Sequence, residues 1–330
     1  MSKPLDRRGF LKTGGLALAG AALPARLSVS PSAEPVLRVA QFTDVHMLGG
    51  DWAKDSMDGL RRSLTSIAAS KPDLIFNTGD AIMDSLYADR AWADAQWACF
   101  LQVLSEFPDL KVHHVLGNHD VWGWGFPQGI QKKMASDDPQ FGKQLAIDNL
   151  NMGGPFYFFD QEGWRFIALD SMSPADPNPT VNLGIPYVGR LDDVQFDWLT
   201  QCVNECTGPI CILSHIPFLA GCEIFDGDNE TSGNWVVPGA WVHIDARRLR
   251  NLLRGRMGEF PFDDRPPVLC LSGHTHQIEV EDHLGVRYMT NGSVCADWWG
   301  EDGHYLDAPR GYEIINLYAD GSSSGQYVQY

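Results

Sequence analysis

The sequence is poor in positive charge: 25 Lys and Arg stand against 42 Asp and Glu, which gives a formal net charge of -17. A surface of this sign repels polyanions at long range, so extended nucleic acid is not expected as a partner. A small phosphate ester is not excluded, because bound cations can reverse the field inside a pocket. The sequence also lacks internal repeats, coiled-coil heptads and low-complexity stretches, which indicates an ordinary folded chain with a buried core.

A long apolar run is also missing. The run from Gly14 to Leu23 is too short for a membrane span of about 20 residues, so no stable membrane anchor is expected. It follows the segment Asp6–Lys12, which resembles a twin-arginine export signal. We therefore expect a signal peptide over residues 1–25, with the cut between 25 and 33, and a single domain over 34–330. This predicts a periplasmic or secreted bacterial protein that uses the twin-arginine export machinery as a partner.

The seven cysteines fit no zinc-finger spacing. Cys211 and Cys270 lie in apolar runs, where a small buried hydrophobic side chain is the expected role. An oxidising destination permits a disulfide among Cys202, Cys206 and Cys222, and the sequence does not choose one pairing.

Short apolar runs alternate with helical segments along the chain, a pattern typical of α/β layering. Most of the runs lack polar alternation, as expected for strands covered on both faces. We expect strands at 36–43, 73–78, 112–116, 165–169, 209–213, 268–271, 286–290 and 312–318, and helices at 57–70, 91–107, 191–203 and 246–254. Two long segments rich in Gly, Pro and Asp, at 121–155 and 216–245, are expected to form loops beside an active site.

Polar clusters follow five of these runs. They are Asp44-Val45-His46, Gly79-Asp80, Gly117-Asn118-His119-Asp120, Ser214-His215 and Gly273-His274-Thr275-His276. Open α/β sheets bind ligands at the carboxyl ends of their strands. Each cluster alone has an ordinary structural explanation, such as a turn or a buried histidine, but the ordered set favours a metal site.

Carboxylate, amide oxygen and neutral imidazole suit divalent ions such as Mn, Fe, Zn, Co or Ni. Two such ions about 3.5–4 Å apart need a bridging ligand, and a carboxylate fits that role. The pair lowers the pKa of a shared water, which makes hydroxide available for in-line attack on phosphorus. The residue types therefore favour hydrolysis of phosphate esters.

The set resembles the calcineurin-like metallophosphoesterases, whose signature runs Asp-x-His, Gly-Asp, Gly-Asn-His-Asp/Glu, His and Gly-His-x-His in this order. The resemblance covers about Val39 to Asn291. It implies a four-layer αββα sandwich of two mixed β-sheets flanked by helices. It also implies two divalent or trivalent metal ions and an exported phosphohydrolase that uses a metal-bridging hydroxide.

Carried over by residue, the resemblance implies a first metal held by Asp44, His46, Asp80 and His276, and a second held by Asp80, Asn118, His215 and His274. Asp80 would bridge the two ions. His119 would contact the phosphate without binding metal and would protonate the leaving oxygen, while Asp120 would orient His119 or be structural.

The sequence departs from some branches of this family. Purple acid phosphatases carry a metal-binding Tyr in the pattern Gly-Asp-x-x-Tyr, and Gly79–Asp84 contains no Tyr, so a tyrosinate-bound ferric site is not expected. The chain is similar to the small bacterial phosphodiesterases and phosphatases. Monoester or diester preference, the natural substrate, the metal identity and the oligomeric state stay open. The alternatives are a non-catalytic metal-binding protein of the same fold and a nuclease.

Overall fold

The computed structural model describes residues 34–127, 130–175, 184–221, 237–254, 266–295 and 308–330, which all belong to the compact unit Glu34–Tyr330. The predicted signal peptide and its cleavage site lie outside the described residues. Among the helices that are described, none combines the length and the apolar character needed to cross a membrane.

One sheet has five strands in the order β13-β12-β1-β2-β3. Its strands β1, β2 and β3 run parallel, whereas β12 is antiparallel to β1 and β13 is antiparallel to β12. The bounds are β1 Leu37–Phe42, β2 Leu74–Asn77, β3 Val112–His114, β12 Gly311–Leu317 and β13 Ser323–Gln329. The sheet therefore joins both ends of the domain, with β1 at its centre.

The second sheet has six strands in the order β10-β11-β9-β8-β5-β4. Its four central strands are parallel, and its two edge strands run antiparallel to them. The bounds are β4 Tyr157–Gln161, β5 Trp164–Ala168, β8 Ile210–Leu213, β9 Val268–Ser272, β10 Glu279–His283 and β11 Val286–Thr290. A small antiparallel pair, β6 (Met172–Pro174) and β7 (Tyr187–Gly189), lies apart from both sheets.

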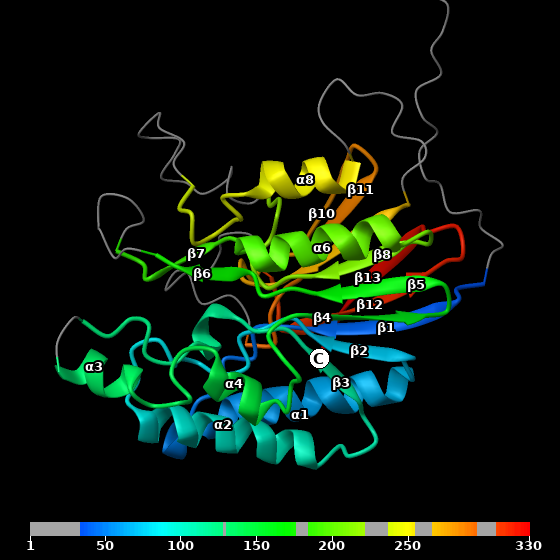
Figure 1. The fold of residues 1–330 in the computed structure, drawn as a ribbon. Helices are drawn as coiled ribbons and strands as arrows, with labels where there is room; N and C mark the ends of the chain where they lie inside the picture. The colour runs from blue at the N-terminus through cyan, green and yellow to red at the C-terminus, as the bar shows by residue number, and fades with distance from the viewer. Residues whose placement is uncertain (1–33, 128–129, 176–183, 222–236, 255–265, 296–307) are drawn as a thin grey trace, which may run out of the picture. The chain divides into compact units, whose positions relative to one another are not determined.

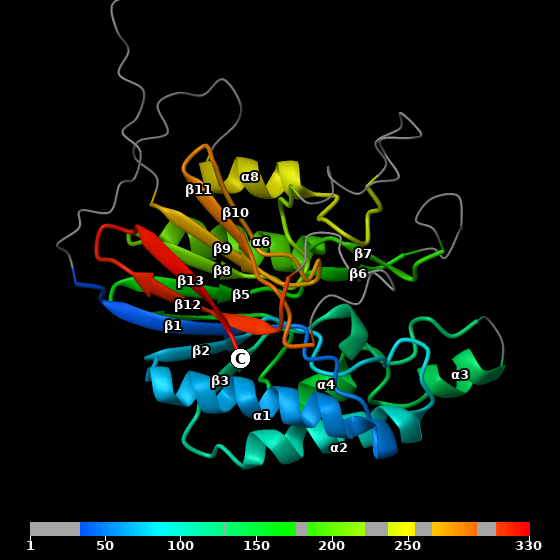
Figure 2. The ribbon, with the colours of Figure 1, turned by 180° about the vertical axis from the view of Figure 1, so that it is seen from behind.

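Helices cover the outer face of each sheet (Figures 1 and 2). The helices α1 (Ala53–Ser70) and α2 (Arg90–Ser105) lie on the five-stranded sheet, and α6 (Asp193–Glu205) and α8 (Ala246–Arg254) lie on the six-stranded sheet. Three buried clusters match this order, because one lies under each helix layer and one lies between the sheets. The predicted αββα sandwich is therefore confirmed.

The sequence of β1 shows why its strand lies between two apolar layers. Ala40 and Phe42 pack on the side of α1, while Leu37 and Val39 pack between the sheets, as the two-residue period of a strand requires. The helix α2 begins at a favourable N-cap, since the Asp89 side chain accepts a hydrogen bond from Trp92 N at 2.9 Å. The alternating burial of β1 places the strand between two apolar layers, and the N-cap of α2 fixes where that helix begins.

Several expectations were incomplete or wrong. The segment 121–155 is not one loop, because it contains α3 (Ile130–Ser136) and α4 (Gln144–Asn149), and α4 buries Leu145 and Ala146 in the core beneath the five-stranded sheet. The strands β4, β6, β7, β10 and β13 were not predicted. Cys202 and Cys206 carry no disulfide, and Cys222 lies outside the described residues.

Candidate metal centre

The carboxyl ends of the central strands lie at one edge of the sandwich, and hydrogen bonds join the loops that follow them. Asp44 N donates to Gly79 O at 3.0 Å, and His46 N donates to Asp80 O at 3.1 Å. The two sheets are linked in the same way, because His274 N donates to Asp44 Oδ2 at 3.0 Å. Residues 230 positions apart in the sequence, such as His46 and His276, are therefore held beside one another.

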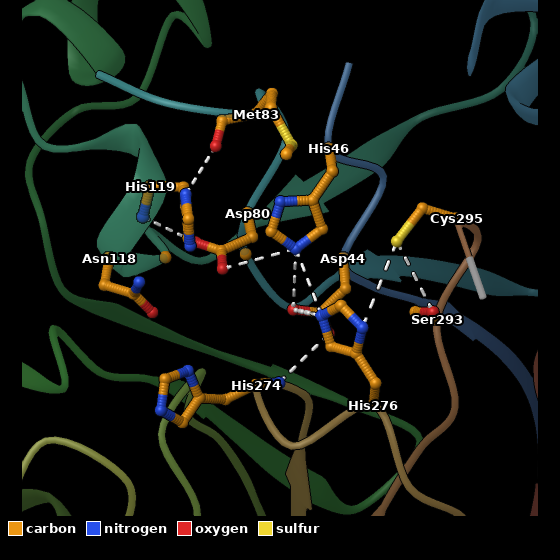
Figure 3. A network of polar contacts seen from close by, with 12 residues as sticks. Asp44, His46, Asp80, Met83, Asn118, His119, His274, His276, Ser293 and Cys295 are labelled. Carbon is orange, nitrogen blue, oxygen red and sulfur yellow. Dashed lines mark hydrogen bonds and ion pairs between the residues drawn. The ribbon is translucent and has the colours of Figure 1, made fainter. Parts of the chain in front are cut away.

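The first group of predicted ligands converges on one point (Figure 3). His46 Nε2 lies 3.1 Å from His276 Nε2, 3.6 Å from Asp44 Oδ1 and 3.7 Å from Asp80 Oδ2. His276 Nε2 lies 3.3 Å from Asp44 Oδ1. Ligand atoms at bond lengths of about 2.0–2.2 Å around one ion are separated by about 3 to 3.6 Å, so the atoms of Asp44, His46 and His276 fit a single cation, and Asp80 Oδ2 lies at the margin of this range.

The second predicted group gathers on the other side of Asp80. His215 Nε2 lies 3.0 Å from Asn118 Oδ1 and 3.2 Å from Asp80 Oδ2. A ring nitrogen of His274 completes a cluster in which the ligand atoms of Asp80, His215 and His274 all lie within 4.8 Å of one another. The structure therefore brings all seven predicted ligands into two adjacent groups.

Asp80 is shared by the two groups through a single oxygen. Its Oδ2 faces His46 on one side and His215 on the other. Its Oδ1 accepts a hydrogen bond of 2.8 Å from His119 N, so this second oxygen is already used. Oδ2 is therefore the Asp80 oxygen that would be offered to both groups if metal ions were bound.

The contacts of the Asp44 carboxylate show whether the site suits a metal ion. Its Oδ2 accepts hydrogen bonds from Thr43 Oγ1 at 2.7 Å and from His274 N, whereas Oδ1 is fully buried without a hydrogen-bond donor. A buried carboxylate oxygen without a hydrogen bond is costly, and the ring nitrogens of His46 and His276 are its polar neighbours at 3.6 and 3.3 Å. Because Oδ1 points at the shared focus of the first group, a cation there would satisfy it, and the residues fit the group that they are expected to hold.

The electrostatics of the site show how strongly it favours positive charge. Burial alone would raise the pKa values of Asp44 and Asp80, but the neighbouring histidines outweigh it and hold both pKa values below their usual range. Burial disfavours the charged form of His215, yet Asp80 raises the pKa of His215 to about 9, and Asp44 likewise raises the pKa of His276. Metal ions would replace these protons, since only neutral imidazole binds metal.

The other two predicted imidazole ligands are neutral near pH 7. Burial lowers the pKa of His46 to about 4 and that of His274 to about 3. Neutral imidazole has a lone pair available for a metal ion, so burial prepares both rings for coordination.

Main-chain carbonyls orient two of the rings. His215 Nδ1 lies 2.9 Å from Thr78 O, and His274 Nε2 lies 2.9 Å from Ala240 O. A carbonyl only accepts, so each of these nitrogens carries a hydrogen and the opposite nitrogen of the ring is the one offered to the site. Such outer contacts fix the tautomer and the ring angle of a metal ligand.

The backbone is strained at five of the seven predicted ligands. Nine described non-glycine residues have positive φ, and five of them are Asp44 (φ 52°), His46 (47°), Asp80 (52°), His274 (74°) and His276 (58°). This left-handed region costs free energy for residues with a Cβ, and it is retained where the surrounding structure holds it for a function. The concentration of strain here is independent support for a functional site.

The glycines of the three motifs make room for the ligands. A Cβ on Gly117 would lie 2.1 Å from both Asp80 N and Asp80 Oδ1. A Cβ on Gly273 would lie 2.4 Å from Asp44 Oδ2, and one on Gly79 would lie 2.6 Å from His215 Nδ1. The motif glycines therefore allow close approach of the strand ends.

His119, the predicted non-ligating histidine, borders the first group. Its ring is edge-on to His46, with centroids 4.8 Å apart. Its Nδ1 contacts Met83 O, so the ring is held from the Nδ1 side. Its side chain is partly exposed, unlike that of His46. This position is suitable for a group that donates a proton to a leaving oxygen.

Asp120 is structural rather than a partner of the His119 ring. Its Oδ1 accepts from Ala81 N at 2.9 Å and from Ile82 N at 3.3 Å, and its Oδ2 accepts from Gly117 N at 2.8 Å. It therefore ties the loop after β2 to the loop after β3. The role of Ala240 was not predicted from the sequence, because a carbonyl contact has no side-chain signal.

The fold and the clustered ligands define a metal-dependent hydrolase. Residues 37–278 match the family model described as calcineurin-like phosphoesterase. The chain therefore belongs to the calcineurin-like phosphoesterase family and is a metal-dependent phosphoesterase.

Three relatives illustrate this likeness. A probable cyclic nucleotide phosphodiesterase of a Synechococcus species is 25% identical over 304 residues, covering 88% of this chain and 91% of that protein. A probable cyclic nucleotide phosphodiesterase of Psychrobacter arcticus is 22% identical, covering 78% and 80% of the two chains. The crystal structure of a dimetal phosphatase from Danio rerio shares the fold, with a TM-score of 0.57 at 15% identity, covering 88% of this chain and 99% of that one.

Proposed function

We propose that this chain is an exported hydrolase of small phosphodiesters that uses two metal ions. The observation that carries the proposal is Asp80 Oδ2, a single buried oxygen directed at two separate groups of metal-ligating atoms. In this proposal Asp44, His46 and His276 complete the first site, and Asn118, His215 and His274 complete the second.

When bound, the two ions would supply a nucleophile at neutral pH and neutralise charge on the phosphoryl oxygens. The residues of the chain set the charge of the site, donate the proton and orient the metal ligands. The buried carboxylates of Asp44 and Asp80 fix the charge of the site, and the partly exposed His119 gives a proton to the leaving oxygen through Nε2. Thr78 and Ala240 hold the rings of His215 and His274 at the required angle.

A diester fits this protein better than a monoester does. A phosphodiester carries one negative charge at neutral pH, whereas a monoester carries up to two. Long-range repulsion by a chain of net charge -17 therefore disfavours the monoester more. The names of the two sequence relatives, both probable cyclic nucleotide phosphodiesterases, support the same preference.

The test compares bis-para-nitrophenyl phosphate with para-nitrophenyl phosphate. The purified protein should show the higher kcat/KM for the diester, lose activity with a chelator and regain it with Mn²⁺. Asp80→Asn should lower turnover at least about 100-fold, because it weakens both sites at once. Asp197→Asn, at an exposed position of α6, is the matched control and should behave like the wild type.

Two results would contradict the proposal. Fewer than one metal ion per chain after reconstitution would remove its basis. Two bound ions without turnover of any ester would favour a non-catalytic metal-binding protein.

Export also belongs to the proposal, and it rests on the sequence of residues 1–25. The ligands span Asp44 to His276, so they assemble only in the folded chain. A route that carries folded proteins suits a protein that acquires its metal ions before export.

A further inference from the structure

The segment Val237–Asp245, which precedes α8, touches the predicted second metal group. Ala240 is fully buried, and its carbonyl oxygen lies 2.9 Å from His274 Nε2. This contact holds the hydrogen of His274 on Nε2 and turns Nδ1 toward Asp80 and His215. The position of Ala240 therefore determines whether His274 faces the site.

Backbone hydrogen bonds attach this segment to its surroundings at both ends. Gly189 N donates to Gly239 O at 2.7 Å, and Ile244 N donates to Gly189 O at 2.8 Å. His243 N donates to Pro217 O at 3.0 Å. The segment is thus clamped against β7 and the loop after β8, with Ala240 between the two attachments.

One side chain of the segment, His243, is completely buried. The His243 ring, with no exposed side-chain surface, lies between Asp245 and Ser214. Its Nδ1 is 2.9 Å from Asp245 Oδ1, and its Nε2 is 3.4 Å from Ser214 Oγ. Phe218 packs edge-on against the ring at 4.7 Å. A buried, bonded imidazole of this kind fixes the segment in one position.

The partners of His243 connect it to both the site and the fold. Ser214 directly precedes the predicted ligand His215, and its backbone N donates to Leu271 O in β9. Asp245 Oδ2 accepts from Leu191 N at 3.2 Å. The ring of His243 therefore bridges the end of β8 and the start of α8.

A Ser, a His and an Asp in line are the composition of a nucleophilic triad, but the geometry excludes that role. Ser214 is 1% exposed, and its hydroxyl donates to Ile216 O at 2.6 Å. A nucleophile needs access to substrate and a proton that its base can remove. The constellation is a structural support.

We propose that His243 is a positioning residue for the second metal site. It holds Val237–Asp245 so that the carbonyl of Ala240 keeps His274 in the tautomer and at the angle that coordination requires. This inference rests on the proposed two-metal function. His243 lies outside both ligand groups, and it affects the second metal site without affecting the first.

The experiment measures Mn²⁺ binding to the purified full-length protein by calorimetric titration and by the spin-coupled signal of an ion pair. His243→Ala should weaken the second Mn²⁺ about 10- to 100-fold and leave the first within about twofold. His243→Asn, whose amide nitrogen replaces Nδ1 toward Asp245, should lose less. His283→Ala, at an exposed position in β10, is the control and should match the wild type.

Two further readouts separate positioning from general damage. Circular dichroism should show a folded protein, and a high Mn²⁺ concentration should restore kcat in both His243 variants. If His243→Ala does not fold, His243→Asn decides the question. Wild-type affinity for both ions in a folded His243 variant would overturn this inference alone. A wild-type protein that binds fewer than two ions would overturn the proposed function, and the inference with it.

Discussion

His119 is partly exposed, and its Nδ1 contacts Met83 O. We predict that His119→Ala keeps both metal ions and loses rate because a proton donor is removed. General acid catalysis contributes about 10²- to 10⁴-fold, and its contribution grows with the basicity of the leaving group. Hydrolysis of an alkyl diester should therefore fall at least about 100-fold, and hydrolysis of a nitrophenyl diester much less.

The measurement is steady-state kinetics on the two diesters, together with elemental analysis of the protein. A His119→Ala protein without metal would show that His119 is a ligand. An equal loss of rate for both esters would argue that the ring binds phosphate rather than donating a proton.

Glu313 of β12 is a second residue with a specific prediction. It is 4% exposed, and burial raises its pKa to about 7 from 4.5. Between these pH values the unfolded chain binds fewer protons at this site, so the free energy of unfolding falls as the pH rises. Because one pKa unit corresponds to about 1.36 kcal/mol, the loss amounts to about 3 kcal/mol by pH 8.

Glu313→Gln cannot ionise and should escape this loss. Relative to the wild type, we expect the variant to gain up to about 3 kcal/mol between pH 5 and pH 8 in urea unfolding experiments. Glu205→Gln, at an exposed position of α6, should follow the wild type at both pH values. Parallel pH profiles for Glu313→Gln and the wild type would contradict the assignment.

At the scale of elements, the ends of β2 and β3 approach too closely for a side chain between them. The backbone of Gly117 (φ -101°, ψ 170°) is ordinary for alanine, so only the contact of its Cβ with Asp80 opposes the substitution. We predict that Gly117→Ala destabilises the fold by about 3 kcal/mol and weakens metal binding, because Asp80 must move.

Gly153 supplies the matched control, since a Cβ there would meet nothing within 4 Å. Gly153→Ala should change the free energy of unfolding by less than about 0.5 kcal/mol. Urea unfolding and Mn²⁺ titration of both variants decide the matter. Equal stability of the two alanine variants would show that the strand ends separate without cost.

Most strands that the sequence predicts have neighbours on both sides; the edge strand β3 is the exception. The strands β8 and β9 are buried along their whole length, so they read as continuous apolar runs. The strands β4, β10 and β13 form sheet edges, where exposure permits polar and charged residues and removes the apolar signal. The helices α3 and α4 were missed because they are only seven and six residues long.

The site was more predictable than the edges, because its ligand types occur in order at strand ends. Asp44, Asp80 and His276 were assigned to one metal through the family resemblance, and the structure places their side chains near one another. The sequence did not reveal that Asp80 Oδ2 lies beside both groups while Oδ1 accepts a hydrogen bond from His119 N. The contribution of Ala240 depends on the path of the backbone, which only the structure gives.

At the scale of the whole molecule, the metal centre draws on both sheets and on nearly the full length of the domain. His46 and His276 lie 3.1 Å apart although 230 residues separate them. Partly folded chains therefore lack the site, and metal loading depends on completed folding. The arginine pair Arg7-Arg8 and the apolar run behind it predict export by a route that carries folded proteins, which would let the chain acquire metal ions first.

We predict that replacing both Arg7 and Arg8 by Lys retains the protein in the cytoplasm, because the charge of the segment is kept but the twin-arginine signal is lost. The measurement is fractionation of cells that express the full chain, with phosphodiesterase activity and bound metal determined in each fraction. Lys12→Arg keeps the arginine pair and is the matched control. Export of the double Lys variant at the wild-type level would contradict the assignment of the segment, while leaving the metal site untouched.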